Sequence, residues 1–382
     1  MTSTLLDNLH KTVKESRLFG RYINLDMISP IIQDLDSKFK IETLGSSVNK
    51  QPIYSIQIGS GPIKVLMWSQ MHGNESTTTK AIFDMFKAIE GESEAFKYLL
   101  ERCTLCIIPV LNPDGATLYT RLNANEIDLN RDAQDLTQPE SLVLKTCFEA
   151  FQPHYCFNLH GQRTIFGVGD TGKVATVSFL APAQDEERSV TPNRATAMAI
   201  ISYMTAFLSE DIPGQVGIYD DSFNINCVGD TFQASGVPTI LFEAGHYADD
   251  YNREEVRRFI FKAMYWALEA ISNSSALDGH ESYFDIPENT KTFYDVIIRN
   301  GRLADDAAES TDIAIQFKEV LDQGTIKFQP VIESIGNLDA FFAHKTIDAQ
   351  SQMVNLDGGK MLQVNYEIDF VFINDQKILI KS

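Results

Sequence analysis

The stretch that decides the fold is residues 64–79, with the sequence KVLMWSQMHGNESTTT. Its apolar first part, Lys64 to Trp68, is typical of a buried strand. A tight turn containing Gly73 follows, and the Ser/Thr-rich end opens a helix with apolar residues at helical spacing. Strand, turn and helix in direct succession indicate an α/β protein, in which ligands bind beyond the carboxyl ends of the strands.

Two residues of this turn are candidate metal ligands. His72 and Glu75 stand three positions apart, and Zn²⁺ takes histidine nitrogen and carboxylate oxygen as ligands. Catalytic zinc sites use three protein ligands and a water, so a third ligand has to come from elsewhere in the chain. By itself His-x-x-Glu is a weak signal, because two common residues often occur at one spacing by chance.

Length and composition indicate an ordinary globular protein. The chain has 382 residues, which suggests about two domains, and its hydrophobic and charged contents are 44% and 22%. The formal net charge of −20 argues against partners that attract basic patches, namely nucleic acids and anionic membrane surfaces. No apolar run approaches the roughly 20 residues that span a bilayer, and no secretory signal is expected at the N-terminus.

The five cysteines predict free thiols rather than a disulfide framework or a zinc site. Cys103 and Cys106 have the C-x-x-C spacing, but they begin a predicted strand, where positions i and i+3 point to opposite faces. No second C-x-x-C completes a zinc site. We therefore expect buried reduced thiols and a cytoplasmic location.

Hydrophobic periodicity predicts an α/β domain over residues 1–275. A helical lead-in precedes alternating short strands and helices, which favours a mixed, largely parallel central sheet flanked by helices. The strands are expected at 40–44, 53–58, 63–68, 105–110, 154–159 and 239–242, and the helices at 78–89, 142–151, 191–208 and 254–271.

A second domain is predicted after the polar linker Ser272–Ser275. Strands are expected at 293–299, 313–321, 325–332, 361–373 and 377–380, several with alternating apolar and polar residues. We interpret residues 280–382 as a small antiparallel β domain. It contains no constellation of residues suited to catalysis.

Four polar residues lie at or just beyond ends of predicted strands: His72, Asn112, His160 and Glu243. Because the carboxyl ends of parallel strands meet at one edge of a sheet, these residues are expected to share a site.

The order of motifs along the chain resembles the zinc carboxypeptidase family over roughly residues 50–270. Asn112-Pro113-Asp114-Gly115 alone predicts only a turn. Together with His72-x-x-Glu75, the following Arg121, the segment 127–132, His160 and Glu243, it matches that family's ordered motifs. The aspartoacylase and succinylglutamate desuccinylase branch is also similar, since it shares the metal-ligand pair, an Asn-Arg pair, a late Glu and a small β domain.

The resemblance implies one zinc ion per chain, held by His72, Glu75 and His160. The fourth position is then open for water, whose pKa zinc lowers to about 7. Glu243 corresponds to the general base that takes a proton from water and passes it to the leaving amine. His246 is the rival ligand, but its place three residues after Glu243 suits a supporting role.

The resemblance also implies roles in substrate binding. Arg121 is the candidate for stabilising the oxyanion. Asn130 and Arg131 are the candidate clamp for a substrate carboxylate, which the planar guanidinium matches in bidentate fashion. Tyr219 is the candidate for the family's mobile tyrosine, with Tyr247 as the alternative.

Other interpretations of single residues stay open. Arg131 beside Asp128 and Asp132 also suits a surface ion pair, and a lone histidine such as His160 is often structural.

Three functions remain in competition. The first is a zinc metallocarboxypeptidase that cleaves an amide next to a free carboxylate. The second is an N-acyl amino acid deacylase, and the third is a non-catalytic peptide-binding protein. The expected partner is thus a peptide or N-acyl amino acid with a free carboxylate.

Overall fold

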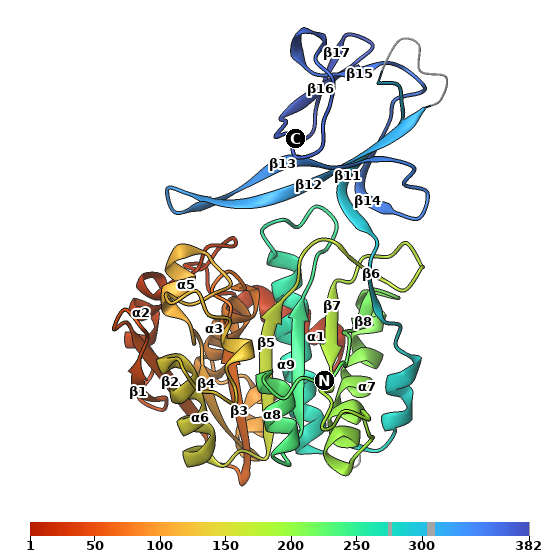
Figure 1. Ribbon diagram of the computed structural model, residues 1–382. Coiled ribbons are helices and arrows are strands. Elements are labelled where there is room, and N and C mark those ends of the chain that lie inside the picture. The colour runs from red at the N-terminus through yellow and green to blue at the C-terminus, as the bar shows by residue number, and fades with distance from the viewer. Residues whose placement is uncertain (274–276, 304–309, 382) are drawn as a thin grey trace. The chain divides into compact units, whose positions relative to one another are not determined.

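The computed structural model describes residues 1–273, 277–303 and 310–381 (Figure 1). It forms two compact units: Met1–Gln162 with Ala175–Asn289, and Arg163–Val174 with Thr290–Ser382. The predicted domain boundary at 275–280 lies earlier than this division, because Tyr283 and Ile286 are buried in the core of the first unit. Residues 274 and 275 of the predicted linker lie outside the described residues.

An eight-stranded mixed sheet forms the centre of the first unit (Figure 1). Its strands in sheet order are β1 (Lys40–Ser46), β2 (Pro52–Gly59), β4 (Cys103–Ile108), β3 (Ile63–Ser69), β5 (Tyr155–Gly161), β9 (Thr239–Ala244), β7 (Val177–Leu180) and β8 (Val216–Ile218). The four central strands β4, β3, β5 and β9 run parallel. β1 is antiparallel to β2, β2 is antiparallel to β4, and β7 is antiparallel to β9 but parallel to β8. The predicted mixed, largely parallel sheet is thus confirmed.

Two hydrophobic cores cover the two faces of this sheet. Alternation along β3 sends Val65 and Met67 into one core and Leu66 and Trp68 into the other. The larger core contains α1 (Ser3–Val13), α2 (Leu25–Gln33), α3 (Thr77–Glu90), α4 (Glu94–Leu100), α7 (Pro192–Asp211) and α9 (Glu254–Ser272). The smaller core contains α6 (Pro139–Phe151) and the short α8 (Val228–Ala234).

The Asn112–Gly115 motif begins the helix α5 (Pro113–Leu118), where the sequence alone predicted only a turn. Asn112 caps it by accepting the N–H of Gly115 at 2.8 Å, and it donates to the Met71 carbonyl at 3.2 Å. The turn after β3 packs directly on this helix start: a Cβ on Gly73 would lie 1.9 Å from the Gly115 carbonyl carbon. Glycine is therefore required beside His72.

The second unit is rich in β structure, as predicted. One sheet has the order β13-β12-β11-β14, with β11 and β14 parallel and the other pairs antiparallel. A three-stranded antiparallel sheet has the order β15-β16-β17. The strands are β6 (Phe166–Val168), β10 (Asn289–Lys291), β11 (Phe293–Gly301), β12 (Thr311–Asp322), β13 (Thr325–Gly336), β14 (Phe342–Asp348), β15 (Val354–Asn355), β16 (Phe370–Ile373) and β17 (Gln376–Leu379).

The predicted strand at 361–373 is wrong over most of its length, because only β16 (Phe370–Ile373) is extended and paired as a strand. Leu362, Val364, Tyr366 and Ile368 would share one face of a strand. Leu362 and Ile368 are buried, however, whereas Val364 and Tyr366 are exposed, so the segment is irregular although its sequence alternates. Asn365 has a φ of 71°, which breaks an extended conformation.

All five cysteines are free thiols, and only Cys227 is partly exposed. Cys103 and Cys106 lie in different cores, on opposite faces of the sheet, as predicted. Among the described helices none combines the length and the apolar character that crossing a membrane requires.

A buried cluster of charges ties the N-terminal helix to α3 and α9. Arg257 donates two hydrogen bonds to Asp84, at 2.5 and 2.7 Å, and His10 Nε2 lies 2.9 Å from the same carboxylate. Lys80 and Glu254 form a neighbouring ion pair at 2.6 Å. Arg257, Asp84 and Lys80 are fully buried, so each charge depends on its partner.

Replacing Asp84 with alanine is expected to lower the free energy of unfolding by about 3–5 kcal/mol, because it leaves the Arg257 charge buried and unpaired. Urea denaturation would measure the loss. Glu94→Ala is the control, since Glu94 and Lys97 are exposed and 3.9 Å apart, and it is expected to cost at most about 1 kcal/mol. Equal losses in the two variants would contradict the argument.

The pH dependence of stability is expected to depend on Glu254. Burial raises its pKa, but Lys80 and Lys14 outweigh burial and hold the pKa at about 2. A carboxylate whose pKa is lower in the folded state stabilises the fold above its unfolded pKa. This stabilisation is lost as the pH falls from about 4.5 towards 2. Urea denaturation at several pH values should therefore show that the free energy of unfolding falls less in this window for Glu254→Gln than for the wild type. Parallel curves for the two proteins would refute the role of Glu254.

Candidate active site

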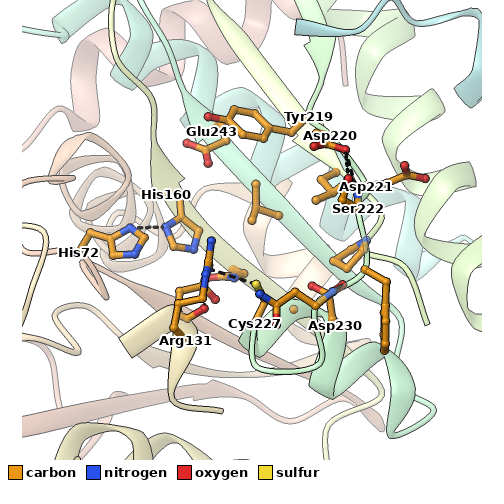
Figure 2. A pocket seen from close by; sticks show the side chains of 18 of the residues that line it. His72, Arg131, His160, Tyr219, Asp220, Asp221, Ser222, Cys227, Asp230 and Glu243 are labelled. Carbon is orange, nitrogen blue, oxygen red and sulfur yellow. Dashed lines mark hydrogen bonds between the residues drawn. The ribbon is translucent and has the colours of Figure 1, made fainter. Parts of the chain in front are cut away.

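Three predicted ligand residues converge just beyond the ends of β3 and β5. His72 Nδ1 lies 2.9 Å from Glu75 Oε1, and His160 Nδ1 lies 2.9 Å from Glu75 Oε2. The two Nδ1 atoms are 3.1 Å apart (Figure 2). Among the His, Cys, Asp and Glu side chains of the described ranges, these three form the group that lies close enough together to hold a metal ion.

The chemistry of these three groups fits zinc. A tetrahedral shell with ligands at about 2.0–2.2 Å places its ligand atoms about 3.3 Å apart, close to the separations found here. The Asp128 carboxylate can only accept from His72 Nε2, so in the neutral imidazole the proton is on Nε2 and Nδ1 keeps its lone pair. That is the tautomer in which Nδ1 can bind a metal ion.

Asp128 orients His72, the first of the three candidate ligands. Its Oδ1 accepts from His72 Nε2 at 3.1 Å, and its Oδ2 accepts from Arg121 Nε at 3.0 Å. Burial raises the pKa of Asp128, but the hydrogen bond with His72 and the positive charge of Arg121 lower it below its usual range. A carboxylate behind a ligating histidine fixes the ring and raises its basicity. Sequence reasoning saw Asp128 only as a possible ion-pair partner of Arg131.

Strand register places the predicted base beside the candidate metal ligands. His160 on β5 pairs with Glu243 on the parallel strand β9. Glu243 is 8% exposed, and its Oε2 has no hydrogen-bond partner among the described residues. Burial, helped by the negative charge of Glu75, raises the pKa of Glu243 well above its ordinary value.

A cavity of about 490 Å³ opens over these groups and includes every predicted substrate-binding residue. Tyr219 lies beside Glu243 on one side and Arg131 lies on the other (Figure 2). The lining consists of His72, Arg121, Asn130, Arg131, Asn158, His160, Leu180, Pro182, Tyr219, Asp220, Asp221, Ser222, Phe223, Asn224, Cys227, Gly229, Asp230, Leu241 and Glu243.

Asn130 and Arg131 are fixed to the segment that leads into α8. Asn130 Oδ1 accepts the N–H of Val228 at 3.0 Å, and Arg131 NH1 lies 3.1 Å from Cys227 Sγ. Among the described residues Arg131 forms no ion pair with Asp128 or Asp132. Asp128 pairs with Arg121, and Asp132 accepts from Thr137. The surface ion-pair alternative is therefore wrong.

The two rival residues lie elsewhere. His246 is buried against Tyr251, with ring centroids 4.8 Å apart, and is outside the ligand trio. Tyr247 packs against Phe259 and does not line the cavity. Tyr219 is thus the tyrosine at this site.

Sequence reasoning missed Asn158 and the cavity wall formed by residues 220–230. Asn158 could have been found, because alternate residues of a strand share a face and Asn158 stands two positions before His160. No comparable signal existed for the wall, which is mostly an irregular loop.

Comparison with known proteins agrees with this geometry. Residues 27–160 match the family model described as zinc carboxypeptidase. The chain is 28% identical over 99 residues to probable carboxypeptidase 2 of Arthroderma benhamiae, covering 25% of this chain and 19% of that protein. It is 28% identical over 141 residues to carboxypeptidase SOL1 of Arabidopsis thaliana, covering 32% and 29%. The chain thus spans less than a third of either relative.

The fold is that of zinc carboxypeptidases, as the resemblance implied. The crystal structure of carboxypeptidase A from Helicoverpa armigera superimposes with a TM-score of 0.53 at 16% identity, covering 72% of this chain and 80% of that one.

Protein purified without chelator is expected to hold about one zinc ion per chain, and His160→Ala is expected to lose it. Adding zinc to metal-free protein should raise the melting temperature, because an ion that binds only the folded state stabilises it. His154→Ala is the control, since His154 is exposed and precedes the opposite end of β5. Metal analysis and thermal denaturation would measure both effects. Stoichiometric zinc in His160→Ala would rule out the proposed ligand.

Proposed function

Because the chain has the zinc carboxypeptidase fold, we propose that it is a zinc-dependent metallocarboxypeptidase. In this proposal it hydrolyses the amide bond next to a free carboxylate of a peptide or small peptide-like substrate. One observation carries the proposal: a single cavity is lined by His72 and His160 of the trio, by Glu243 and by Arg131.

The trio of His72, Glu75 and His160 would hold the metal ion. When bound there, Zn²⁺ supplies Lewis-acid polarisation of a carbonyl and acidifies water. Asp128 keeps the imidazole of His72 in the required orientation through the 3.1 Å contact with Nε2. Glu75 is anchored in turn, since its Oε2 accepts the N–H of Gly161 at 3.0 Å.

Glu243 acts as the general base and then as the general acid. Its carboxylate takes a proton from the attacking water and delivers it to the nitrogen of the leaving amine. Burial supports this role, because it raises the pKa of Glu243 and so makes the carboxylate a stronger base than an exposed glutamate. The buried, unpartnered Oε2 is the atom available for the transfer.

Four polar residues bind the substrate. Arg131 and Asn130 hold its terminal carboxylate, for which the planar guanidinium offers a bidentate match. Arg121, whose guanidinium contacts His72 and Asp128, stabilises the negative charge that develops on the carbonyl oxygen. Tyr219, which lines the same cavity, would pack over the bound substrate.

Replacing Glu243 with glutamine is expected to lower kcat on a blocked dipeptide by about 10²–10⁴-fold, because the side chain keeps its shape but cannot accept the proton. KM and zinc content should stay within about twofold of the wild type. Steady-state kinetics on zinc-loaded protein would measure this, with the exposed Glu94→Gln as control. Unchanged turnover in Glu243→Gln would contradict the assigned base.

A substrate panel separates the competing functions. Zinc-loaded protein should release the C-terminal residue from peptides and not depend on an N-acyl group. Turnover of N-acyl amino acids alone would replace the peptidase by a deacylase. Calorimetric binding of peptides without any turnover would instead indicate a binding protein.

A further inference from the structure

The floor of the cavity lies on the same strand faces as the proposed catalytic groups. Asn158 and Leu241 pair across β5 and β9, just as His160 and Glu243 do two residues later. Side chains two residues apart share a face of a strand, and two residues advance it by about 6.6 Å. Asn158 and Leu241 therefore lie on the same face of the sheet as His160 and Glu243, about 6.6 Å earlier along the two strands.

Asn158 is a buried amide without protein partners. Its side chain is 0% exposed, and neither Oδ1 nor Nδ2 forms a hydrogen bond with another described residue. Around it the cavity is lined by the apolar side chains of Leu180, Pro182 and Leu241. Buried polar groups are nearly always hydrogen-bonded, so an amide left unpaired at the floor of a cavity indicates a partner that enters the cavity.

Gly229 packs closely against Pro182 beside this amide. A Cβ at Gly229 would lie 3.9 Å from Asn158 Nδ2, an ordinary contact, and 2.9 Å from Pro182 Cγ, which would have to shift. A larger residue at this position would therefore displace the Pro182 wall of the cavity. Next to the glycine, Asp230 also lines the cavity and is 7% exposed.

We propose that Asn158 is the specificity-determining residue of this cavity, and that it selects substrates whose C-terminal residue carries a carboxamide, namely glutamine or asparagine. This inference rests on the proposed carboxypeptidase function.

The count of donors and acceptors supports a carboxamide. Its N–H donates to Asn158 Oδ1 while its carbonyl accepts from Nδ2, so both unpaired atoms are satisfied. An apolar side chain satisfies neither atom. Lysine and arginine have only donors and leave Nδ2 unpaired, whereas an ionised carboxylate has only acceptors and leaves Oδ1 unpaired.

Asp230 adds to this selectivity. Burial raises its pKa to about 6, so the side chain is mostly a carboxylate at neutral pH. A buried carboxylate disfavours acidic side chains and can accept the second N–H of a carboxamide. It also attracts cations, so the discrimination against lysine and arginine rests on Asn158 Nδ2 alone.

The first test measures stability and needs no turnover. Asn158→Leu keeps the shape of the side chain and removes an unsatisfied amide, so its melting temperature is expected to rise by about 2 °C or more. The matched control is Asn112→Leu: Asn112 is equally buried but uses both amide atoms, and its melting temperature should fall by about 2–4 °C or more. A fall in Asn158→Leu like that of the control would overturn the inference, because it would indicate a structural amide.

The second test measures selectivity on zinc-loaded protein. Blocked dipeptides ending in glutamine should show kcat/KM about 100-fold above those ending in leucine, lysine or glutamate. Asn158→Leu should reverse the order of glutamine and leucine, and Asn158→Asp should favour lysine. A preference of the wild type for leucine, lysine or glutamate, or an unchanged preference in Asn158→Leu, would overturn the inference.

If no peptide is cleaved, the proposed function fails, and binding then decides the role of Asn158 separately. Calorimetry with free glutamine and free leucine should give tighter binding of glutamine to the wild type and loss of that difference in Asn158→Leu. Equal or weaker binding of glutamine by the wild type would overturn the inference.

Discussion

The Glu75 carboxylate is the group on which the site depends. Its two oxygens contact the Nδ1 atoms of His72 and His160 at 2.9 Å, and Oε2 also accepts the N–H of Gly161. It therefore joins the turn after β3 to the end of β5. Burial raises the pKa of Glu75, but the two histidines lower it far below its usual range, so the carboxylate stays ionised. The carboxylates of Glu75 and Asp128 contact the two ring nitrogens of His72, and their negative charges favour a cation at this position.

Much of this arrangement follows from local sequence. The strands β1 to β5 and β9 and the long helices of the first unit were predictable because burial on both faces gives near-continuous apolar strands and amphipathic helices. The short elements α4, β7, β8 and α8 were not predicted, because so few residues carry no clear period. His72, His160 and Glu243 were predictable as a group because each ends a parallel strand. The resemblance to zinc carboxypeptidases supplied their roles and those of Arg121 and Arg131. The comparisons confirm the fold that this resemblance implied, whereas the roles of the individual residues remain proposals.

Features that depend on distant packing were not predictable. Asn112 suggests a turn locally, yet its contact with Met71 and the close approach of Gly73 make the motif a helix start that supports the turn carrying His72 and Glu75. The segment 361–369 alternates like a strand, but its burial comes from an irregular path with a positive φ at Asn365. The specificity of the cavity depends on which side chains meet across β5, β9 and α8, and no single stretch of sequence encodes that meeting.

The second unit is discontinuous in the chain, and this affects the order in which the protein can fold during synthesis. Segment Arg163–Val174 belongs to that unit, although residues of the first unit precede and follow it. Its partners in the second unit, such as Phe293, whose N–H donates to the Ile165 carbonyl, are made only after α9. The segment therefore lacks these partners at the time when the strands of the central sheet, which precede and follow it in the chain, can already pair. A nascent chain could thus complete the proposed metal site before the second unit exists, and the two units would mature in sequence rather than together.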